Sequence, residues 1–173
     1  APLPRRAALS GLLLAEAAAI SVFLVVPSWQ RSVFAAGVYL SPEAFRNVPV
    51  EVAEAGTKLL FYRDSFNATV SVHQTGETIF LKVGGKTDAS NGIDMGTQAL
   101  SAHIPLLLHP DPKRVLVIGL GSGVTLGHAA RYPLSTLHCA ELDPAVIEGA
   151  KFFKDYNYGV HDDPRVTIFP ADG

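Results

Sequence analysis

A short apolar run followed by a glycine-rich turn constrains the fold of this chain more than any other feature. The residues VLVI at 115–118 are apolar and mostly β-branched, as in a parallel strand buried on both faces. They lead into GLGSG at 119–123, and a stretch with helical character continues to Arg131. Glycines let a backbone approach a ligand closely, and the N terminus of a helix presents free N–H groups. The pattern predicts the first strand, ligand-binding loop and helix of an open α/β sheet.

The next predicted strand carries an acidic residue at the position where such folds bind a ribose. Residues 137–140 are apolar and end at Glu141, which lies 22 residues after Gly119. In such folds, an acid about 20 residues beyond the glycine loop accepts hydrogen bonds from ribose hydroxyls. The alternative interpretation of Glu141 is a solvated acid at the end of a strand. The G-x-G-x-x-G spacing of dinucleotide folds is absent, since it requires glycine at Val124. Asp143 stands before a proline and is predicted to cap the next helix.

A third strand is predicted over residues 165–169, and it leads to Asp172 and Gly173. An aspartate at this strand end can accept a hydrogen bond from the adenine amine, and a glycine lets the ring approach closely. Strand, loop, helix, strand and strand make the first half of a doubly wound domain. Because such sheets normally have five or more strands, we expect the chain to be a truncated piece of a longer protein.

The N-terminal part of the chain is dominated by an apolar run at residues 7–26, with Glu16 as its single ionisable residue. A helix of that length spans about 30 Å, the thickness of a bilayer core. We therefore predict a transmembrane helix over residues 1–26. A cleaved signal peptide and a buried soluble helix are the alternatives. Arginines lie on both sides of the run, so the sequence leaves its orientation open.

The rest of the chain divides into three segments. Residues 27–57 read as a connector with an initial strand, and residues 58–93 alternate in polarity as a small antiparallel β-domain does. Within this β-domain, His73 is predicted to be a solvated strand residue and not a ligand. Residues 94–173 form the cofactor-binding half, beginning with a helix that prolines end near residue 108.

Charge and cysteine content exclude several classes of function. The net charge is −2, and Lys and Arg form no cluster of the kind that binds nucleic acid. The single cysteine, Cys139, excludes an internal disulfide framework and a cysteine-based zinc site. The sequence predicts neither a metal site nor a nucleic-acid partner.

The motifs taken together resemble the polyamine aminopropyltransferases, spermidine synthase and its relatives. The resemblance rests on residues 94–98, HIPLLLHPDPKRVLVIGLGSG at 103–123, AELDPAVIEGAKFF at 140–153 and DDPRVTIFPADG at 162–173. The apolar N-terminal helix is similar to that of a bacterial subgroup whose synthase-like domain follows membrane helices. The resemblance implies an α/β fold: the first half of a methyltransferase-like Rossmann domain, preceded by a small antiparallel β-domain and an N-terminal transmembrane helix.

The resemblance also implies an activity and a site. In the family, an aminopropyl group passes from decarboxylated S-adenosylmethionine to a diamine such as putrescine, a step of polyamine biosynthesis. The candidate cofactor-binding residues are Gln98, Gly119, Gly121, Ser122, Gly123, Glu141, Asp172 and Gly173. The family's catalytic base falls beyond Gly173, so we expect this piece by itself to be inactive.

Three positions depart from the family pattern. Ser122 stands where relatives usually have an aspartate, Thr97 where they have a tyrosine, and Gly56 where they have a glutamine. A neutral serine is expected to relax the choice between the decarboxylated and the intact cofactor; the alternative is that Ser122 only caps the following helix. A methyltransferase that uses intact S-adenosylmethionine and a non-catalytic membrane-bound sensor of an adenosyl metabolite are the alternative functions.

The expected partners are a small-molecule amine and the membrane, and homo-oligomer formation is left open. The expected location is the bacterial inner membrane, with the cofactor-binding domain on the cytoplasmic side.

Overall fold

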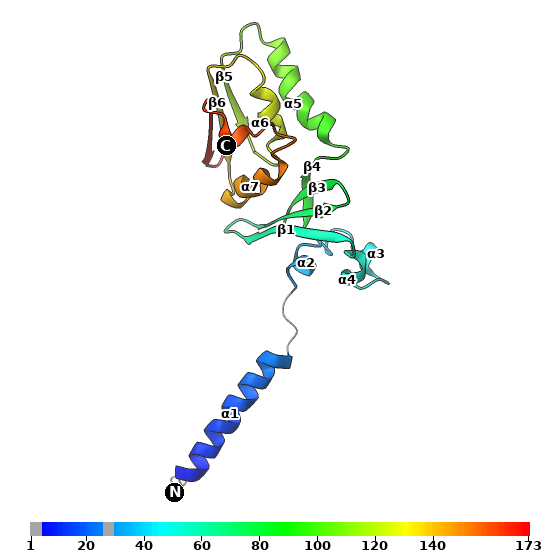
Figure 1. The fold of residues 1–173 in the computed structure, drawn as a ribbon, viewed down its shortest axis with the longest axis vertical. Coiled ribbons are helices and arrows are strands. Elements are labelled where there is room, and N and C mark those ends of the chain that lie inside the picture. Colours follow the sequence, from blue (N-terminus) through cyan, green and yellow to red (C-terminus); the bar gives the residue numbers. More distant parts are fainter. Residues whose placement is uncertain (1–4, 26–29) are drawn as a thin grey trace. The chain divides into compact units, whose positions relative to one another are not determined.

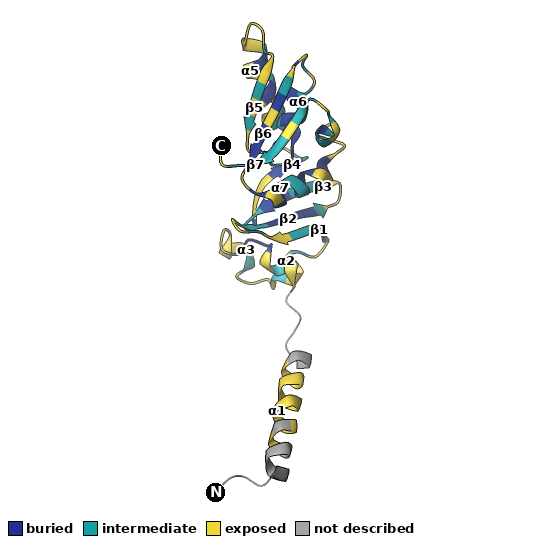
Figure 2. Cartoon of the chain, turned by 90° about the vertical axis from the view of Figure 1, so that its left-hand side faces the viewer, coloured by how far each residue is buried: buried dark blue, intermediate teal, exposed yellow. Residues whose placement is uncertain are grey.

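The computed structural model describes residues 5–25 and 30–173, which belong to two compact units, Ala1–Gln30 and Arg31–Gly173. In the first unit, helix α1 spans Arg5–Val25, and its side chains are described at residues 11 and 13–22 (Figure 1). These residues are exposed, including Leu14 and Ile20 at 72% and 60% (Figure 2). Among the described residues, no helix is both long and apolar enough to cross a membrane. The described residues therefore do not support the transmembrane helix predicted over residues 1–26. Residues 1–4 and 26 of that prediction lie outside the described residues.

The second unit begins with the predicted connector, which forms three single-turn helices; the strand expected in it was wrong, since residues 30–56 contain none. These are α2 (Arg31–Phe34), α3 (Pro42–Phe45) and α4 (Val50–Ala53). Gly37 and Gly85 lie in close contact, and a side chain on Gly37 would overlap the carbonyl group of Gly85. This contact holds the connector against the strands that follow.

The predicted antiparallel β-domain is confirmed as a four-stranded sheet in the order β1-β2-β3-β4. Its strands are β1 (Thr57–Asp64), β2 (Thr69–Thr75), β3 (Thr78–Val83) and β4 (Lys86–Ser90). Val70, Val72 and Leu81 are fully buried on one face, where they join the core of the second unit. Gly76 has a φ of +58° in the turn between β2 and β3, a conformation that glycine adopts without strain.

The prediction that His73 is solvated was wrong. Its side chain is 1% exposed, its ring stacks on Phe80 with centroids 5.5 Å apart, and its Nε2 lies 3.0 Å from Ser71 Oγ. The opposite face of β2 is buried too, so alternation of polar and apolar residues does not mark a solvated face here. Lys82 lies beside it and pairs with Glu54 at 3.8 Å, so a polar layer fills this face of the sheet.

The cofactor-binding half forms a parallel sheet in the order β5-β6-β7. Its elements are α5 (Met95–Leu108), β5 (Arg114–Ile118), α6 (Val124–Ala129), β6 (Thr136–Glu141), α7 (Pro144–Gly149), the 3-10 helices η1 (Ala150–Phe153) and η2 (Val160–Asp162), and β7 (Val166–Pro170). The predicted elements are confirmed as α5, β5, the glycine loop, α6, β6 and β7, and their bounds agree with the prediction to within one or two residues. The mixed fold, an antiparallel sheet and then a parallel sheet of Rossmann type, is as predicted.

One core connects the two sheets of this unit. Helix α7 contacts β1, β2 and β6, and it lies between the sheets in Figure 1. Gly149 makes this approach close, because a Cβ there would lie 3.0 Å from Leu81 and 3.3 Å from Val72. Phe153, fully buried, extends the same contact from η1. The antiparallel sheet is thereby fixed against the cofactor-binding half.

The prediction that β5 is buried on both faces was wrong. Val115 and Val117 pack against the core, but Leu116 and Ile118 are 57% and 66% exposed. Helices α5 and α6 cover one face of the strand, and β6 pairs with one of its edges. The other edge and the other face of β5 are open among the described residues (Figure 2).

Burial of His73 makes folding pH-dependent. Desolvation, and then the charge of Lys82, lower the pKa of His73 from 6.5 to about 4. The unfolded chain therefore binds a proton at pH values where the folded chain does not, so stability is full above pH 6.5 and falls towards pH 4. Integrated over that window, we expect a loss of about 3 kcal/mol from this residue.

Denaturant unfolding of residues 31–173 between pH 7.5 and 4 measures this loss, with His73→Gln as the comparison. Burial also lowers the pKa values of His128 and His161, so both proteins should lose some stability in acid. Parallel pH profiles for the two proteins would contradict the assignment to His73.

Candidate cofactor-binding site

The glycine loop joins β5 to α6 in a conformation that demands glycine. Gly119, Gly121 and Gly123 have φ values of +83°, +55° and +79°, a region that residues with a side chain rarely adopt. Gly119 N–H donates to Ala140 O at 2.8 Å, which fixes the start of the loop to β6. Within the part of the chain that the structure describes, the backbone N–H groups of Gly121 and Ser122 make no hydrogen bond. The loop therefore presents donors at the carboxyl edge of the sheet.

Glu141 lies at the end of β6, where the sequence placed it beside the loop. It is 7% exposed, and its two oxygens accept from different backbone segments. Oε2 accepts from Leu120 N–H at 2.7 Å, and Oε1 accepts from Asp143 N–H at 2.9 Å. Each carboxylate oxygen has a further lone pair, so these bonds leave capacity for hydroxyl groups of a ligand.

Asp143 caps α7, as predicted from the proline that follows it. Its Oδ1 accepts from Ala145 N–H at 2.8 Å and from Ser65 Oγ at 2.7 Å. Ser65 follows β1, so the cap also connects the antiparallel sheet to the cofactor-binding half. Asp143 therefore supports the site indirectly, through the hydrogen bond that its backbone N–H donates to Glu141.

Gln98 and Ser122 lie on different elements and are joined by a hydrogen bond. The hydroxyl of Ser122, 1% exposed, donates to Oε1 of Gln98 on α5. The amide of Gln98 donates at 2.8 Å to Ser90 O and to Asp94 Oδ2. All polar atoms of Gln98 are thereby occupied. Its role in this structure is to hold the glycine loop against α5 and β4.

Asp172 and Gly173 follow β7 and reach the same edge of the sheet. Ala171 N–H donates to Glu141 O at 3.0 Å, which brings this end of the chain next to β6. Gly173 lies against Ile118 at the end of β5, so closely that a Cβ on Gly173 would overlap that side chain. Asp172 is exposed, and its carboxylate is accessible to a ligand. The residues predicted from the sequence therefore gather at the carboxyl ends of the three parallel strands, the edge where open α/β sheets bind ligands.

The chemistry of this set suits a hydroxylated or cationic ligand. Two carboxylates and several backbone donors are present, and none of the predicted site residues is a cation.

Burial, and then the charge of Glu141, raise the pKa of the Cys139 thiol to about 11. This thiol therefore stays protonated at neutral pH, and it serves as an apolar core residue and not as a nucleophile.

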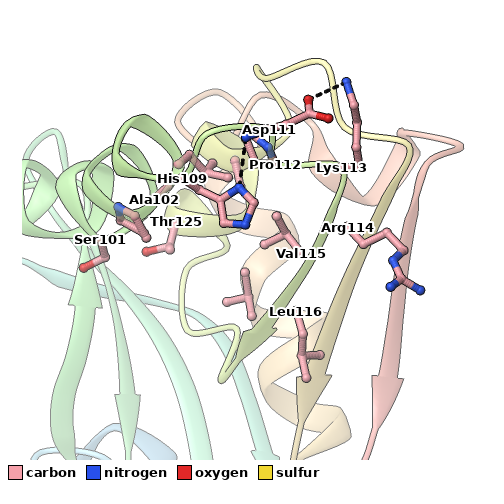
Figure 3. Close-up of a pocket in the computed structure, with 14 residues that line it drawn as sticks. Ser101, Ala102, His109, Asp111, Pro112, Lys113, Arg114, Val115, Leu116 and Thr125 are labelled. Atoms are coloured by element: carbon pink, nitrogen blue, oxygen red, sulfur yellow. Dashed lines mark hydrogen bonds and ion pairs between the residues drawn. The ribbon is translucent and has the colours of Figure 1, made fainter.

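A cavity of about 630 Å³ opens elsewhere, along the free edge of β5 (Figure 3). It is lined by α5, β5 and the turn between them, where Asp111 pairs with Lys113 at 2.9 Å. None of the predicted cofactor-binding residues lines it. Its position reflects the unpaired edge of the sheet and not the chemistry of the strand ends.

Comparisons with known proteins show which family the cofactor-binding half resembles. Residues 95–173 match the spermine/spermidine synthase domain. The match covers 79 of the 173 residues, so this stretch of the chain is similar to that family. The spermidine synthase of Dictyostelium discoideum is 37% identical over 94 residues, which cover 54% of this chain and 33% of that protein.

Two further relatives bear on the fold and the chemistry. The crystal structure of a spermidine synthase in complex with the transition-state analogue AdoDATO superposes with a TM-score of 0.61 and 29% identity, covering 66% of this chain and 40% of that one. Putrescine N-methyltransferase 2 of Nicotiana tabacum is 40% identical over 72 residues, covering 41% and 20% of the two chains. The chain thus spans about a third or less of the curated relatives described.

Two residues near the site were missed from the sequence alone. Asp94 accepts hydrogen bonds from both Ser90 and Gln98, and Asn157 is buried behind the glycine loop. Asp94 lies four residues before Gln98, so a helix-turn spacing could have indicated their contact. Asn157 comes from a turn 34 residues after Gly123, and no local pattern marks it.

We predict that Gly127 in α6 tolerates no side chain. A methyl group there would overlap the carbonyl oxygen of Asn157, so Gly127→Ala should destabilise the protein by about 1–3 kcal/mol through overpacking. Gly96 in α5 has open space around it, so Gly96→Ala should stabilise by about 0.5–1 kcal/mol. Denaturant midpoints measure both changes, and equal effects of the two substitutions would refute the close approach.

Proposed function

We propose that the protein containing this chain transfers an aminopropyl group from decarboxylated S-adenosylmethionine to a small diamine. The observation that carries the proposal is the meeting of Glu141, Asp172 and the glycine loop at one sheet edge, within a domain of the spermine/spermidine synthase family. The relative of known structure was solved with AdoDATO, a transition-state analogue. The proposed co-substrate is therefore an adenosyl sulfonium compound, with no metal.

The proposed roles of the residues follow from their chemistry. Glu141 accepts hydrogen bonds from the ribose hydroxyls, and Asp172 accepts one from the adenine amine. The loop N–H groups and the carboxylates fix the adenosyl group so that the sulfonium-linked carbon faces the amine. The amine nitrogen attacks that carbon, the carbon–sulfur bond breaks, and its electron pair stays on sulfur as 5′-methylthioadenosine. The nitrogen then loses a proton to a base, which we assign to none of the described residues.

An assay of the full-length protein with putrescine and decarboxylated S-adenosylmethionine tests this proposal. Spermidine and 5′-methylthioadenosine should appear in equal amounts. Failure to form either product with a folded, cofactor-binding preparation would exclude the transferase.

Methyl transfer from intact S-adenosylmethionine is the second candidate function, and one observation favours it. Ser122 carries no charge and its hydroxyl is bonded to Gln98, so the loop holds no carboxylate that would repel the carboxylate of the intact cofactor. A relative of this chain is named a putrescine N-methyltransferase. The same assay with intact cofactor distinguishes the two, because methyl transfer would yield N-methylputrescine and S-adenosylhomocysteine.

We predict that Glu141 contributes directly to binding of the adenosyl group. Glu141→Ala should weaken binding of 5′-methylthioadenosine by about 1.5–3 kcal/mol, the scale of hydrogen bonds to a charged group. Because the carboxylate also bonds Leu120 and Asp143, the melting temperature should fall as well.

Calorimetry at a temperature where both proteins are folded separates the two effects. Glu148→Gln is the control, since Glu148 lies on α7 and pairs with Arg63 at 2.5 Å, outside the site. An unchanged dissociation constant for Glu141→Ala would rule out the ribose assignment.

We also propose that residues 7–26 attach the protein to the bacterial inner membrane, with the cofactor-binding domain in the cytoplasm. The support is the apolar run of the sequence and the exposure of its described side chains, Leu13, Leu14, Ile20 and Val22 among them. We predict that the full-length protein stays in the membrane fraction after an alkaline carbonate wash, and that deletion of residues 7–26 releases it. Release of the undeleted protein by carbonate would contradict this location.

A further inference from the structure

Asn157 is the polar residue most completely enclosed near the glycine loop. It lies in the turn after η1 and its side chain is 0% exposed. Its amide Nδ2 donates to Ser122 O at 2.9 Å and to Ala150 O at 3.0 Å, and its Oδ1 accepts from Gly159 N–H at 3.1 Å. Every hydrogen-bonding atom of the amide is therefore used, and one bond reaches the glycine loop directly.

Glycines at the start of α6 and within it leave the space that Asn157 occupies. A Cβ at Gly123 would lie 3.0 Å from Nδ2 of Asn157, and a Cβ at Gly127 would overlap the Asn157 carbonyl oxygen. Gly123 is the N-cap of α6, and Gly127 lies one turn further along, inside the helix. Gly127 thus lacks a side chain inside the helix where Asn157 packs, which is costly in helix propensity and indicates a specific contact.

The bond from Asn157 determines which way one peptide of the loop points. With Ser122 O directed inward to Asn157, Gly123 takes a φ of +79° and its N–H donates to Leu120 O at 2.8 Å. This closes the turn around Gly121 and Ser122, whose N–H groups have no partner among the described residues. A rotation of the Ser122–Gly123 peptide would break the bond from Gly123 N–H to Leu120 O and so open the turn that holds these donors.

We infer that Asn157 is a positioning residue for the adenosyl cofactor, acting through the Ser122 carbonyl to hold the loop in its ligand-binding conformation. This inference rests on the proposed function, since it presumes that the loop binds an adenosyl group. A buried donor facing two carbonyl oxygens cannot be replaced by an acceptor without repulsion. The matching substitution is therefore Asn157→Asp, which keeps the shape of the side chain and removes the donor.

The test compares Asn157→Asp with Asn91→Asp in the full-length protein. Asn91 makes the same two kinds of bond in the antiparallel sheet: its Oδ1 accepts from Ile79 N–H at 2.8 Å, and its Nδ2 donates to Glu77 O at 3.1 Å. Binding of 5′-methylthioadenosine is measured by calorimetry, and hydrogen exchange is measured for residues 119–127. Asn157→Asp should weaken binding at least tenfold and accelerate exchange in the loop, whereas Asn91→Asp should change neither. The KM for the amine substrate should stay within twofold, because a general loss of structure would change it too.

The outcomes separate the inference from the function on which it rests. If the wild-type protein does not bind 5′-methylthioadenosine, the proposed function fails. If the wild type binds and Asn157→Asp binds equally well, the function stands and the positioning role is overturned. If Asn157→Asp does not fold, Asn157→Ala replaces it, since alanine removes the donor without introducing a buried charge. Equal affinity of Asn157→Ala and the wild type then overturns the inference.

Discussion

The carboxylate of Glu141 is the interaction on which the arrangement of the second unit depends. It accepts from the glycine loop through Leu120 and from the start of the next helix through Asp143. Asp143 in turn caps α7 and accepts from Ser65, which belongs to the antiparallel part of the unit. A continuous series of charge-assisted hydrogen bonds therefore runs from the cofactor loop to the neighbouring sheet. Such bonds are stronger than neutral ones, and those of Glu141 and of the helix cap are buried, so the loop and the sheet are fixed as one body.

The sequence predicted the elements of this site because each has a local cause. The glycine loop needs positive φ values that glycine alone adopts readily, and the cap at Asp143 needs a short acceptor before a proline. Glu141 was predicted from its separation from the loop in sequence, because that separation is set by the length of one strand–helix–strand unit. The family resemblance added Gln98, whose contact with Ser122 crosses from α5 to the loop.

Other features could not be predicted, because they depend on contacts between distant segments. His73 lies at a polar position in the alternating pattern of β2, which is typical of a surface residue. In the structure Phe80 stacks on it and its face of the sheet is covered. Asn157 has no motif, and only the folded chain shows that its amide reaches Ser122. The apolar run of β5 indicates two buried faces, but burial of Leu116 and Ile118 requires neighbours that the described residues do not supply. In doubly wound sheets of order 3-2-1-4, a fourth strand pairs with the edge that is free in β5.

In the proposed function, the described residues specify the adenosyl group more fully than the part of the cofactor that reacts. Glu141 is held by two backbone donors, and the loop by Gln98 on one side and Asn157 on the other. In the proposed function, these bonds fix the glycine loop and the ribose acceptor before any ligand binds, which lowers the entropic cost of binding. At the position nearest the reacting end, the neutral hydroxyl of Ser122 is already bonded to Gln98 and offers no charge. Discrimination between an aminopropyl and a methyl donor must therefore come from groups outside the loop.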